Sequence, residues 1–120
     1  MHWNQLEVWK RAHGLVLDIY KTTSSFPRSE SYGITDQLRR AAYSVPANIV
    51  EGQSRNTTKE YVQFLYNLRG SVEEVRYFLF LSKDLGYLKQ EAYEELEHGY
   101  ETVSRLLNGL IKSLKEAKAK

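Results

Sequence analysis

The residue types that most often do chemistry in helical proteins are sparse in this chain. One Glu-x-x-His step is present, formed by Glu95 and His98. Carboxylate-bridged di-iron bundles need two such steps and two further glutamates that point inward, so one step does not make a metal site. Leu96 fits the apolar seam of its helix, which places Glu95 and His98 off that seam, and we expect both on the surface. The sequence predicts no metal and no cofactor.

Other catalytic motifs are missing from the sequence as well. It contains no Gly-rich phosphate loop, no HExxH pair and no nucleophile elbow. His13 lies on an apolar stripe of the first predicted helix, where we expect a buried, hydrogen-bonded histidine rather than a ligand or a general base. No serine has a histidine at a spacing that suggests activation, although distant residues can meet in a folded triad. We therefore expect a protein that is not an enzyme.

Basic side chains are the second kind of candidate, because they contact phosphates and steer association without reading base sequence. The candidates for contact with nucleic acid are Arg39, Arg40, Arg55, Lys59 and Arg69. A second group, near the C-terminus, consists of Arg105, Lys112, Lys115, Lys118 and Lys120. The alternative is that Arg40 and Arg55 pair with Glu51 on the same helix, because helical pairs at such spacings are routine.

Several of these cations belong to an unusual helical stretch between Phe26 and Arg55. Its apolar residues recur at steps of three and four and form one stripe, Leu38, Ala42, Val45 and Ile49. A second stripe is polar and consists of Gln37, Arg40, Ser44, Asn48, Glu51 and Arg55. Pro46 lies inside this helix, where a proline costs roughly 3 kcal/mol. We expect a kink at Pro46 that bends the helix around its core; the alternative is a binding surface made by the freed backbone and the polar stripe.

The same stretch resembles the signature of a known family. The residues that carry the resemblance are Phe26-Pro27, Glu30, Tyr32, Gln37-Leu38-Arg39-Arg40-Ala41-Ala42, Ser44-Val45-Pro46-Ala47-Asn48-Ile49 and Glu51-Gly52, with Leu6-Glu7-Val8-Trp9 near the N-terminus. This pattern is similar to that of the 23S rRNA-intervening sequence proteins, which are four-helix bundles. Their relatives include the accessory variability determinant of diversity-generating retroelements. The resemblance covers nearly the whole chain and departs at Val50, where alanine is expected.

The resemblance implies a four-helix protomer that assembles into a five-fold ring. It also implies association with nucleic acid in at least some members of the family, and it implies no catalytic site. In this chain it marks six motif residues, Gln37, Ser44, Pro46, Asn48, Glu51 and Gly52.

Hydrophobic periodicity predicts the elements that position these residues. Four helices are expected, from about Asn4 to Ser24, from a cap at Ser29 or Ser31 to Gly52, from a capping box at Thr57 to about Leu85, and from about Gln90 to Lys115. Gly52 is expected to cap the second helix, and Gly86 is free to take a positive φ. Because the links are short, we predict an all-α, antiparallel up-down-up-down four-helix bundle that forms a single domain over residues 1–120.

The predicted seams of three helices follow from the same rhythm. The seam of the first helix is Leu6, Trp9, His13, Val16 and Tyr20; that of the third is Tyr61, Leu65, Leu68, Val72, Val75, Leu79 and Ser82; that of the fourth is Tyr93, Leu96, Tyr100, Val103, Leu107, Leu110 and Leu114. The third helix has further apolar residues off its seam, which include Phe64, Tyr66, Tyr77, Phe78 and Phe80. Together they carry more apolar surface than one core can bury, which predicts an interface between copies. The alternative is that some of these rings are merely half-exposed.

Composition sets the remaining bounds. The chain has 120 residues, 42% hydrophobic and 27% charged, which is the balance of one globular domain with a real core. It has no cysteine, and no apolar run approaches the about 18 residues that span a membrane. No secretion signal opens the sequence, so a cytoplasmic location is expected. A net charge of +2 permits nucleic-acid binding without demanding it.

The sequence therefore predicts a non-enzymatic homo-oligomer, a pentamer by resemblance, that associates with nucleic acid through basic surface residues. Structured RNA is the expected ligand, with DNA as another candidate. The alternative is a scaffold or adaptor for a protein partner, including a protein that acts on nucleic acid, with no direct nucleic-acid contact.

Overall fold

Four long helices make up nearly all of the protein. The computed structural model describes residues 2–119, and side chains through residue 117. The helices are α1 (Glu7–Thr23), α2 (Ile34–Gln53), α3 (Thr58–Asp84) and α4 (Gln90–Ala119), with short 3₁₀ turns at Trp3–Gln5 and Arg28–Glu30. Residues 2–119 contain no β-strand. None of the described helices combines the length and the apolar character that crossing a membrane requires.

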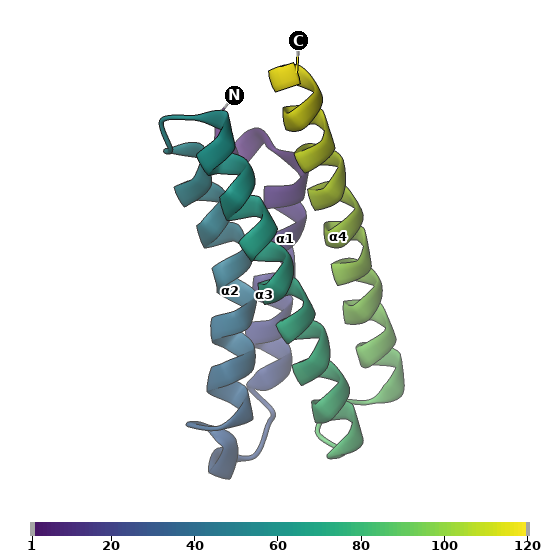
Figure 1. Ribbon diagram of the computed structural model, residues 1–120. Helices are drawn as coiled ribbons and strands as arrows, with labels where there is room; N and C mark the ends of the chain where they lie inside the picture. Colours follow the sequence, from purple (N-terminus) through teal and green to yellow (C-terminus); the bar gives the residue numbers. More distant parts are fainter. Residues whose placement is uncertain (1, 120) are drawn as a thin grey trace.

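The helices form one elongated bundle of 51 × 24 × 21 Å. Figure 1 shows that consecutive helices run in opposite directions along the long axis, so that the links alternate between the two ends. Each helix contacts the two beside it, because α1 packs on α2, α2 on α3, α3 on α4, and α4 closes against α1. The short links leave consecutive helices little choice but to fold back on each other. The predicted all-α four-helix bundle is confirmed.

The core lies along the inner stripes of the four helices. The predicted stripe of α2, Leu38, Ala42, Val45 and Ile49, is fully buried. The predicted seam of α3 is buried from Leu65 to Ser82, with Tyr61 half-buried at its start. In α4 the buried residues are Leu96, Tyr100, Val103, Leu107 and Ile111. Ile111 is therefore the buried residue at the point where the predicted seam has Leu110. Periodicity is a reliable guide here because each of these helices has one dominant apolar stripe.

The predicted seam of α1 is wrong for His13 and Tyr20, whereas Val16 is buried and Leu6 and Trp9 are half-buried against the core. The residues that α1 buries are Val8, Ala12, Leu15, Val16, Ile19 and Thr23. His13 is exposed rather than buried, and its ring stacks on the half-buried Trp9 ring with centroids 4.8 Å apart. Tyr20 is exposed as well. This helix carries two neighbouring apolar stripes, and the aliphatic one faces the core because tryptophan and tyrosine tolerate the boundary with water better than valine and isoleucine do.

The second helix begins later than expected, because residues 28–30 form a separate 3₁₀ turn. Neither Ser29 nor Ser31 caps α2. The Glu30 carboxylate instead accepts a hydrogen bond from the Ile34 backbone N–H at 3.4 Å, and it accepts a second from the Tyr87 hydroxyl at 2.9 Å. Glu30 therefore satisfies the start of α2 and ties it to the link between α3 and α4.

Two other predicted helix ends are confirmed. Thr57 is the N-cap of α3, and its hydroxyl accepts a hydrogen bond from the Glu60 N–H at 3.1 Å. Gly86 follows α3 with a φ of 83°, which side chains with a Cβ rarely adopt.

Gly52 is not a helix cap. It is buried inside α2, which ends at Gln53 with Ser54 as the C-cap. A Cβ at Gly52 would lie 3.0 Å from Cδ1 of Tyr61 and 3.3 Å from Cβ of Phe64. The absent side chain therefore allows α2 and α3 to approach closely beside their link, which is a packing requirement that helix-end patterns do not reveal.

Pro46 is buried within α2, which runs as one helix from Ile34 to Gln53. Ala41 and Ala42 are buried beside it, and small residues of this kind let helix backbones approach closely. The kink at Pro46 stays a prediction.

Candidate nucleic-acid interface

The five cations of the predicted site do not form one cluster. Arg39 is half-buried and joins α2 to the end of α1. Its Nε donates to the Thr23 hydroxyl at 2.8 Å, its Nη2 donates to the Tyr20 carbonyl at 3.4 Å, and its guanidinium lies 4.6 Å from the centre of the Tyr20 ring. These two hydrogen bonds and the stacking contact tie Arg39 to α1, which makes it a packing residue first.

Arg40 and Arg55 each pair with a carboxylate of α2, four residues earlier in the chain. The Nε of Arg40 lies 3.0 Å from Asp36, four residues earlier, and this hydrogen bond raises the pKa of Arg40. The expected partner, Glu51, instead pairs with Arg55 at 3.3 Å. The Arg55 guanidinium also lies 4.2 Å from the centre of the Phe64 ring. The predicted pairing with Glu51 is thus confirmed for Arg55 and wrong for Arg40, because Asp36 lies one helical turn from Arg40 and pairs with it instead.

The motif residues of α2 serve the helix itself. The Ser44 hydroxyl donates to the Ala41 carbonyl at 2.8 Å, and the Asn48 amide donates to the Ser44 carbonyl at 2.7 Å. Gln37 is exposed, whereas Pro46 and Gly52 are buried. Ser44 and Asn48 of the polar stripe therefore satisfy backbone groups around Pro46.

Arg69 has a different environment, at the seam between α3 and α4. Its guanidinium lies 4.8 Å from the centre of the Tyr66 ring, and its Nη1 donates to the side-chain oxygen Oδ1 of Asn108 at 3.3 Å. The Lys115 ammonium reaches the same tyrosine and donates to its hydroxyl at 3.0 Å. Two cations from two helices therefore share one aromatic ring.

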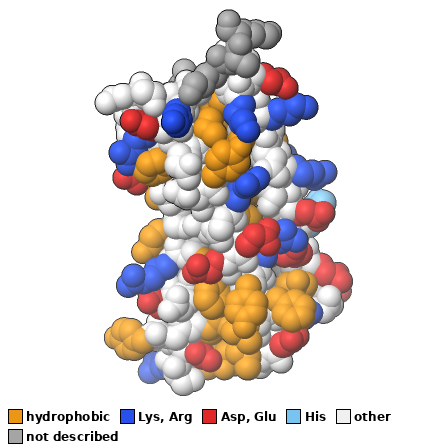
Figure 2. Space-filling model, viewed as in Figure 1, with side chains coloured by type: hydrophobic (Ala, Val, Ile, Leu, Met, Phe, Trp, Pro, Cys, Tyr) orange, Lys and Arg blue, Asp and Glu red, His pale blue; other side chains and the backbone are white. Residues whose placement is uncertain are grey.

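These residues line a depression of about 530 Å³, which we call the Tyr66 hollow. Its lining consists of Tyr66, Arg69, Asn108, Ile111, Lys112, Lys115 and Glu116. Figure 2 shows basic side chains around a small apolar patch in the upper half of the molecule, over α3 and α4. Lys59 lies exposed in the first turn of α3, toward the same end of the bundle. The side chain of Lys118, and Lys120 as a whole, lie outside the described residues.

Three cations of the hollow lack a carboxylate partner. Among the described residues, Arg69, Lys112 and Lys115 have no carboxylate within salt-bridge distance, and Glu116 is the only acid in the lining. By contrast, Arg11, Arg40, Arg55 and Arg76 each pair with an aspartate or glutamate. Other exposed cations, such as Lys21, Arg28 and Lys89, also form no salt bridge with a described residue. The hollow differs in that three such cations line one depression, where an anion would find three positive charges beside one acid.

Sequence reasoning named Arg69 but missed its partnership with Asn108 and Tyr66. A signal was available, because antiparallel helices joined by a short link bring together residues equally far from the link. Tyr66 and Asn108 are the same number of residues from Tyr87, in the link. Hairpin register therefore predicts which side chains meet across α3 and α4, whereas the stripe of a single helix does not.

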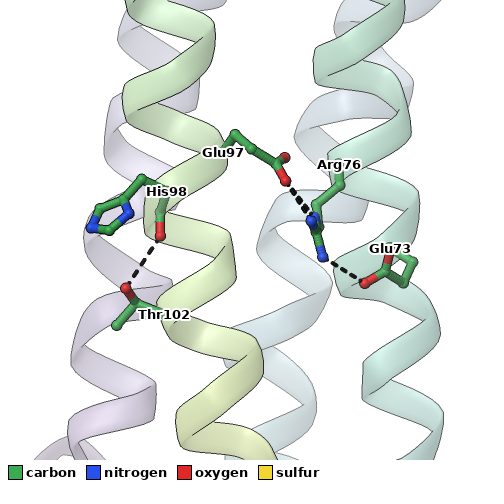
Figure 3. A network of polar contacts seen from close by, with 5 residues as sticks. All are labelled: Glu73, Arg76, Glu97, His98 and Thr102. Atoms are coloured by element: carbon green, nitrogen blue, oxygen red, sulfur yellow. Dashed lines mark hydrogen bonds and ion pairs between the residues drawn. The ribbon is translucent and has the colours of Figure 1, made fainter.

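A second polar network crosses the same seam further down (Figure 3). The Nε of Arg76 donates to Glu97 at 2.8 Å, and its Nη1 lies 3.0 Å from Glu73. The side chains of Arg76 and Glu97 are only 31% and 22% exposed, and the hydrogen bond that Arg76 donates to the Glu97 carboxylate raises the pKa of Arg76. All the polar groups of this network other than one Glu97 oxygen have a partner or reach solvent, which indicates a structural clamp.

The Glu95–His98 step is exposed, as expected. In Figure 3 the His98 ring points away from the Arg76 network, and its backbone carbonyl accepts a hydrogen bond from the Thr102 hydroxyl at 3.2 Å. Residues 2–117 bring no three histidines, aspartates or glutamates into an arrangement that could hold a metal ion.

The predicted oligomer surface divides into exposed and packed residues. Tyr77 and Phe80 are 59% and 46% exposed, whereas Phe64 and Phe78 are half-buried. Phe80 meets Tyr93 of α4 edge to face, with centroids 6.2 Å apart, and the lower half of Figure 2 shows a broad apolar patch over α3 and α4. The exposed part of the predicted surface is thus smaller than the sequence suggested, and its role as an interface stays a prediction.

This chain is similar to a known protein family and to a solved structure. The family model of the 23S rRNA-intervening sequence proteins matches residues 4–109. A similar solved structure is that of a protein with unknown function from the S23 ribosomal protein family of Bacteroides thetaiotaomicron VPI-5482, with a TM-score of 0.78 at 22% identity over 88% of this chain and 98% of that one. At this identity the likeness supports the fold. No curated protein sequence matches. Because the family model spans most of the chain, the protein belongs to the 23S rRNA-intervening sequence protein family.

Proposed function

We propose that this protein is a non-enzymatic, oligomeric bundle of the cytoplasm that associates with nucleic acid, structured RNA first of all. The observation that carries the proposal is the group of uncompensated cations at the Tyr66 hollow, Arg69, Lys112 and Lys115. Exposed lysine and arginine without acidic neighbours are the groups that exchange counterions for phosphates. Lys59, exposed in the first turn of α3 toward the same end of the bundle, adds a further cation to the proposed surface.

Oligomerisation would multiply the effect of so modest a charge. Each copy contributes only a few cations, but a ring of copies presents the same basic surface repeatedly to one RNA. The exposed rings of Tyr77 and Phe80 supply apolar surface for contact between copies. A pentamer is the assembly that the family resemblance implies, and we adopt it for the proposal.

The test is RNA binding measured by fluorescence anisotropy at several salt concentrations. Each phosphate contact contributes roughly −0.7 to −0.9 to the slope of log affinity against log salt, so we expect a steep decline. The triple variant Lys59→Gln, Lys112→Gln, Lys115→Gln should bind at least about tenfold more weakly and show a shallower slope. The matched control is Lys21→Gln, Arg28→Gln, Lys89→Gln, which removes the same charge from exposed positions outside the proposed surface.

Two results would contradict the proposal. One is a lack of binding to both RNA and DNA at low salt. The other is equal loss in the two triple variants, because that would trace the attraction to net charge rather than to this surface. Light scattering with and without RNA gives the stoichiometry in the same experiment.

A second candidate function is a scaffold for a protein partner, and the exposure of Tyr77 and Phe80 favours it. It requires that no nucleic acid bind directly. Retention of one defined protein after nuclease treatment, together with flat RNA titrations, would favour the scaffold over the first proposal.

A further inference from the structure

The arrangement of Arg69 on Tyr66 offers more than charge. The guanidinium lies 4.8 Å from the centre of the ring, and Asn108 holds it there through a hydrogen bond of 3.3 Å. A guanidinium is planar and weakly hydrated, so an arginine held on a ring presents a flat outer face on which another planar group can stack. Nucleobases stack on aromatic rings and on arginine planes in many single-stranded complexes.

The surroundings of this pair suit one nucleotide. The hollow measures about 530 Å³, within the range of about 300–1,000 Å³ that small-ligand sites occupy. Lys112 and Lys115 stand on α4 beside the ring and supply charge for a phosphate. The Asn108 side chain uses its carbonyl oxygen for Arg69, which leaves its amino group to donate to a base edge or a phosphate.

We propose that the Tyr66 hollow binds one unpaired nucleotide, whose base stacks on the Arg69–Tyr66 pair while its phosphate contacts Lys112 and Lys115. This inference rests on the proposed function and specifies its ligand. A base inside a duplex has both faces covered by its neighbours, so the site takes a nucleotide from a loop, a bulge or a single strand. The protein would thereby distinguish folded RNA with exposed loops from a plain duplex of the same charge.

The experiment compares two probes that carry the same number of phosphates, an RNA hairpin with an unpaired loop and a fully paired RNA duplex. We expect the wild-type protein to prefer the hairpin. Arg69→Lys keeps the charge but loses the planar face, and Tyr66→Leu removes the ring. Each should weaken hairpin binding roughly 5- to 100-fold and leave duplex binding nearly unchanged.

Matched variants control for charge and for folding. Arg28→Lys makes the same exchange at an exposed position in the 3₁₀ turn Arg28–Glu30, and Tyr32→Leu removes a tyrosine that is 98% exposed. Neither should change the preference for the hairpin. Tyr66→Phe keeps the ring and should retain it too. If circular dichroism shows that Tyr66→Leu does not fold, Arg69→Lys still tests the proposal, because Arg69 is exposed and its replacement leaves the core intact.

The outcomes separate this inference from the proposed function. If Arg69→Lys binds the hairpin as wild type does while the triple lysine variant is impaired, the surface binds phosphates without stacking, and this inference alone is overturned. Equal wild-type affinity for hairpin and duplex would overturn it as well. If neither probe binds at low salt, both proposals are overturned.

Discussion

At the scale of single residues, the neighbours of an arginine decide what it does. Arg39 bonds to the hydroxyl and carbonyl groups at the end of α1, and Arg40 is neutralised one turn from Asp36. Arg69 has Glu73 four residues further on, but Glu73 pairs with Arg76 instead. Arg69 consequently lies on Tyr66 with its charge uncompensated. The same residue type thus packs, pairs or remains available within one small bundle.

Tyr100 provides a test of polar burial. Its side chain is fully buried, and among the described residues its hydroxyl has no hydrogen-bond partner. An unsatisfied buried hydroxyl costs about 1–3 kcal/mol, so Tyr100→Phe should raise the free energy of unfolding by about 1 kcal/mol in urea titrations at neutral pH. Tyr32→Phe, at a 98% exposed position, should change it by less than about 0.5 kcal/mol.

The same tyrosine should make the protein sensitive to alkali. Burial first, and the Asp18 carboxylate second, raise the pKa of Tyr100. A raised pKa in the folded state means that the contribution to stability is complete below the usual tyrosine pKa of about 10 and is lost as the pH climbs above it. Wild type should therefore lose more stability than Tyr100→Phe between about pH 9 and 11. Parallel pH profiles would show that Tyr100 is not responsible.

Residue roles were the hardest part to predict from the sequence. The Arg55–Glu51 pair follows from spacing alone, and so does the exposure of Glu95 and His98. The exposure of His13 does not follow from spacing, because α1 carries two apolar stripes and only tertiary packing selects between them. The Tyr66 hollow was also invisible along one helix, since it joins residues of α3 and α4 that lie far apart in the chain.

At the scale of elements, α3 and α4 are the pair most connected by polar groups. The Arg76–Glu97 pair lies across their seam, and Arg69 and Lys115 reach across it further up. A pair with both side chains largely covered keeps more of its Coulomb attraction than one in water, and removing one partner leaves the other charge without its compensation, which is costly. The seam therefore depends on this pair more than on the surface pairs of single helices.

Two substitutions that each remove one negative charge separate these contributions. Glu97→Gln should lower the free energy of unfolding by about 1–2 kcal/mol, because Arg76 loses its interhelical partner. Glu73→Gln, at a side chain 65% exposed, should lower it by less than about 0.5 kcal/mol. Urea titrations at one salt concentration measure both, and similar losses would show that the interhelical pair contributes no more than a surface pair.

The elements themselves follow closely from the sequence. Four helices, the stripes of α2 and α3, and the Thr57 cap were all predictable because each rests on a local rule of spacing or capping. The start of α2 and the role of Gly52 were not. Glu30 acts through Tyr87, and Gly52 through Tyr61 and Phe64, and these partners lie on other elements.

At the scale of the whole molecule, the question is what covers the exposed rings of α3. Replacing Tyr77 and Phe80 by serine should shift the mass in light scattering toward the 14.0 kDa protomer, because contact between copies would lose its apolar centre. The fold should survive, since each of these side chains is about half exposed and neither belongs to the buried core. Tyr32→Ser serves as the control and should leave the assembly intact. A wild-type protein that already measures as a protomer would refute the oligomer.

The order in which the four helices pack on one another also affects how the chain folds. Three of the four interfaces join helices that follow each other in the sequence, and only α1 against α4 joins the two ends of the chain. Most contacts therefore form without closing a long loop, and topologies of low contact order fold quickly. The packing of α1 against α4, which brings the two ends of the chain together, is the interface with the largest loop-closure cost.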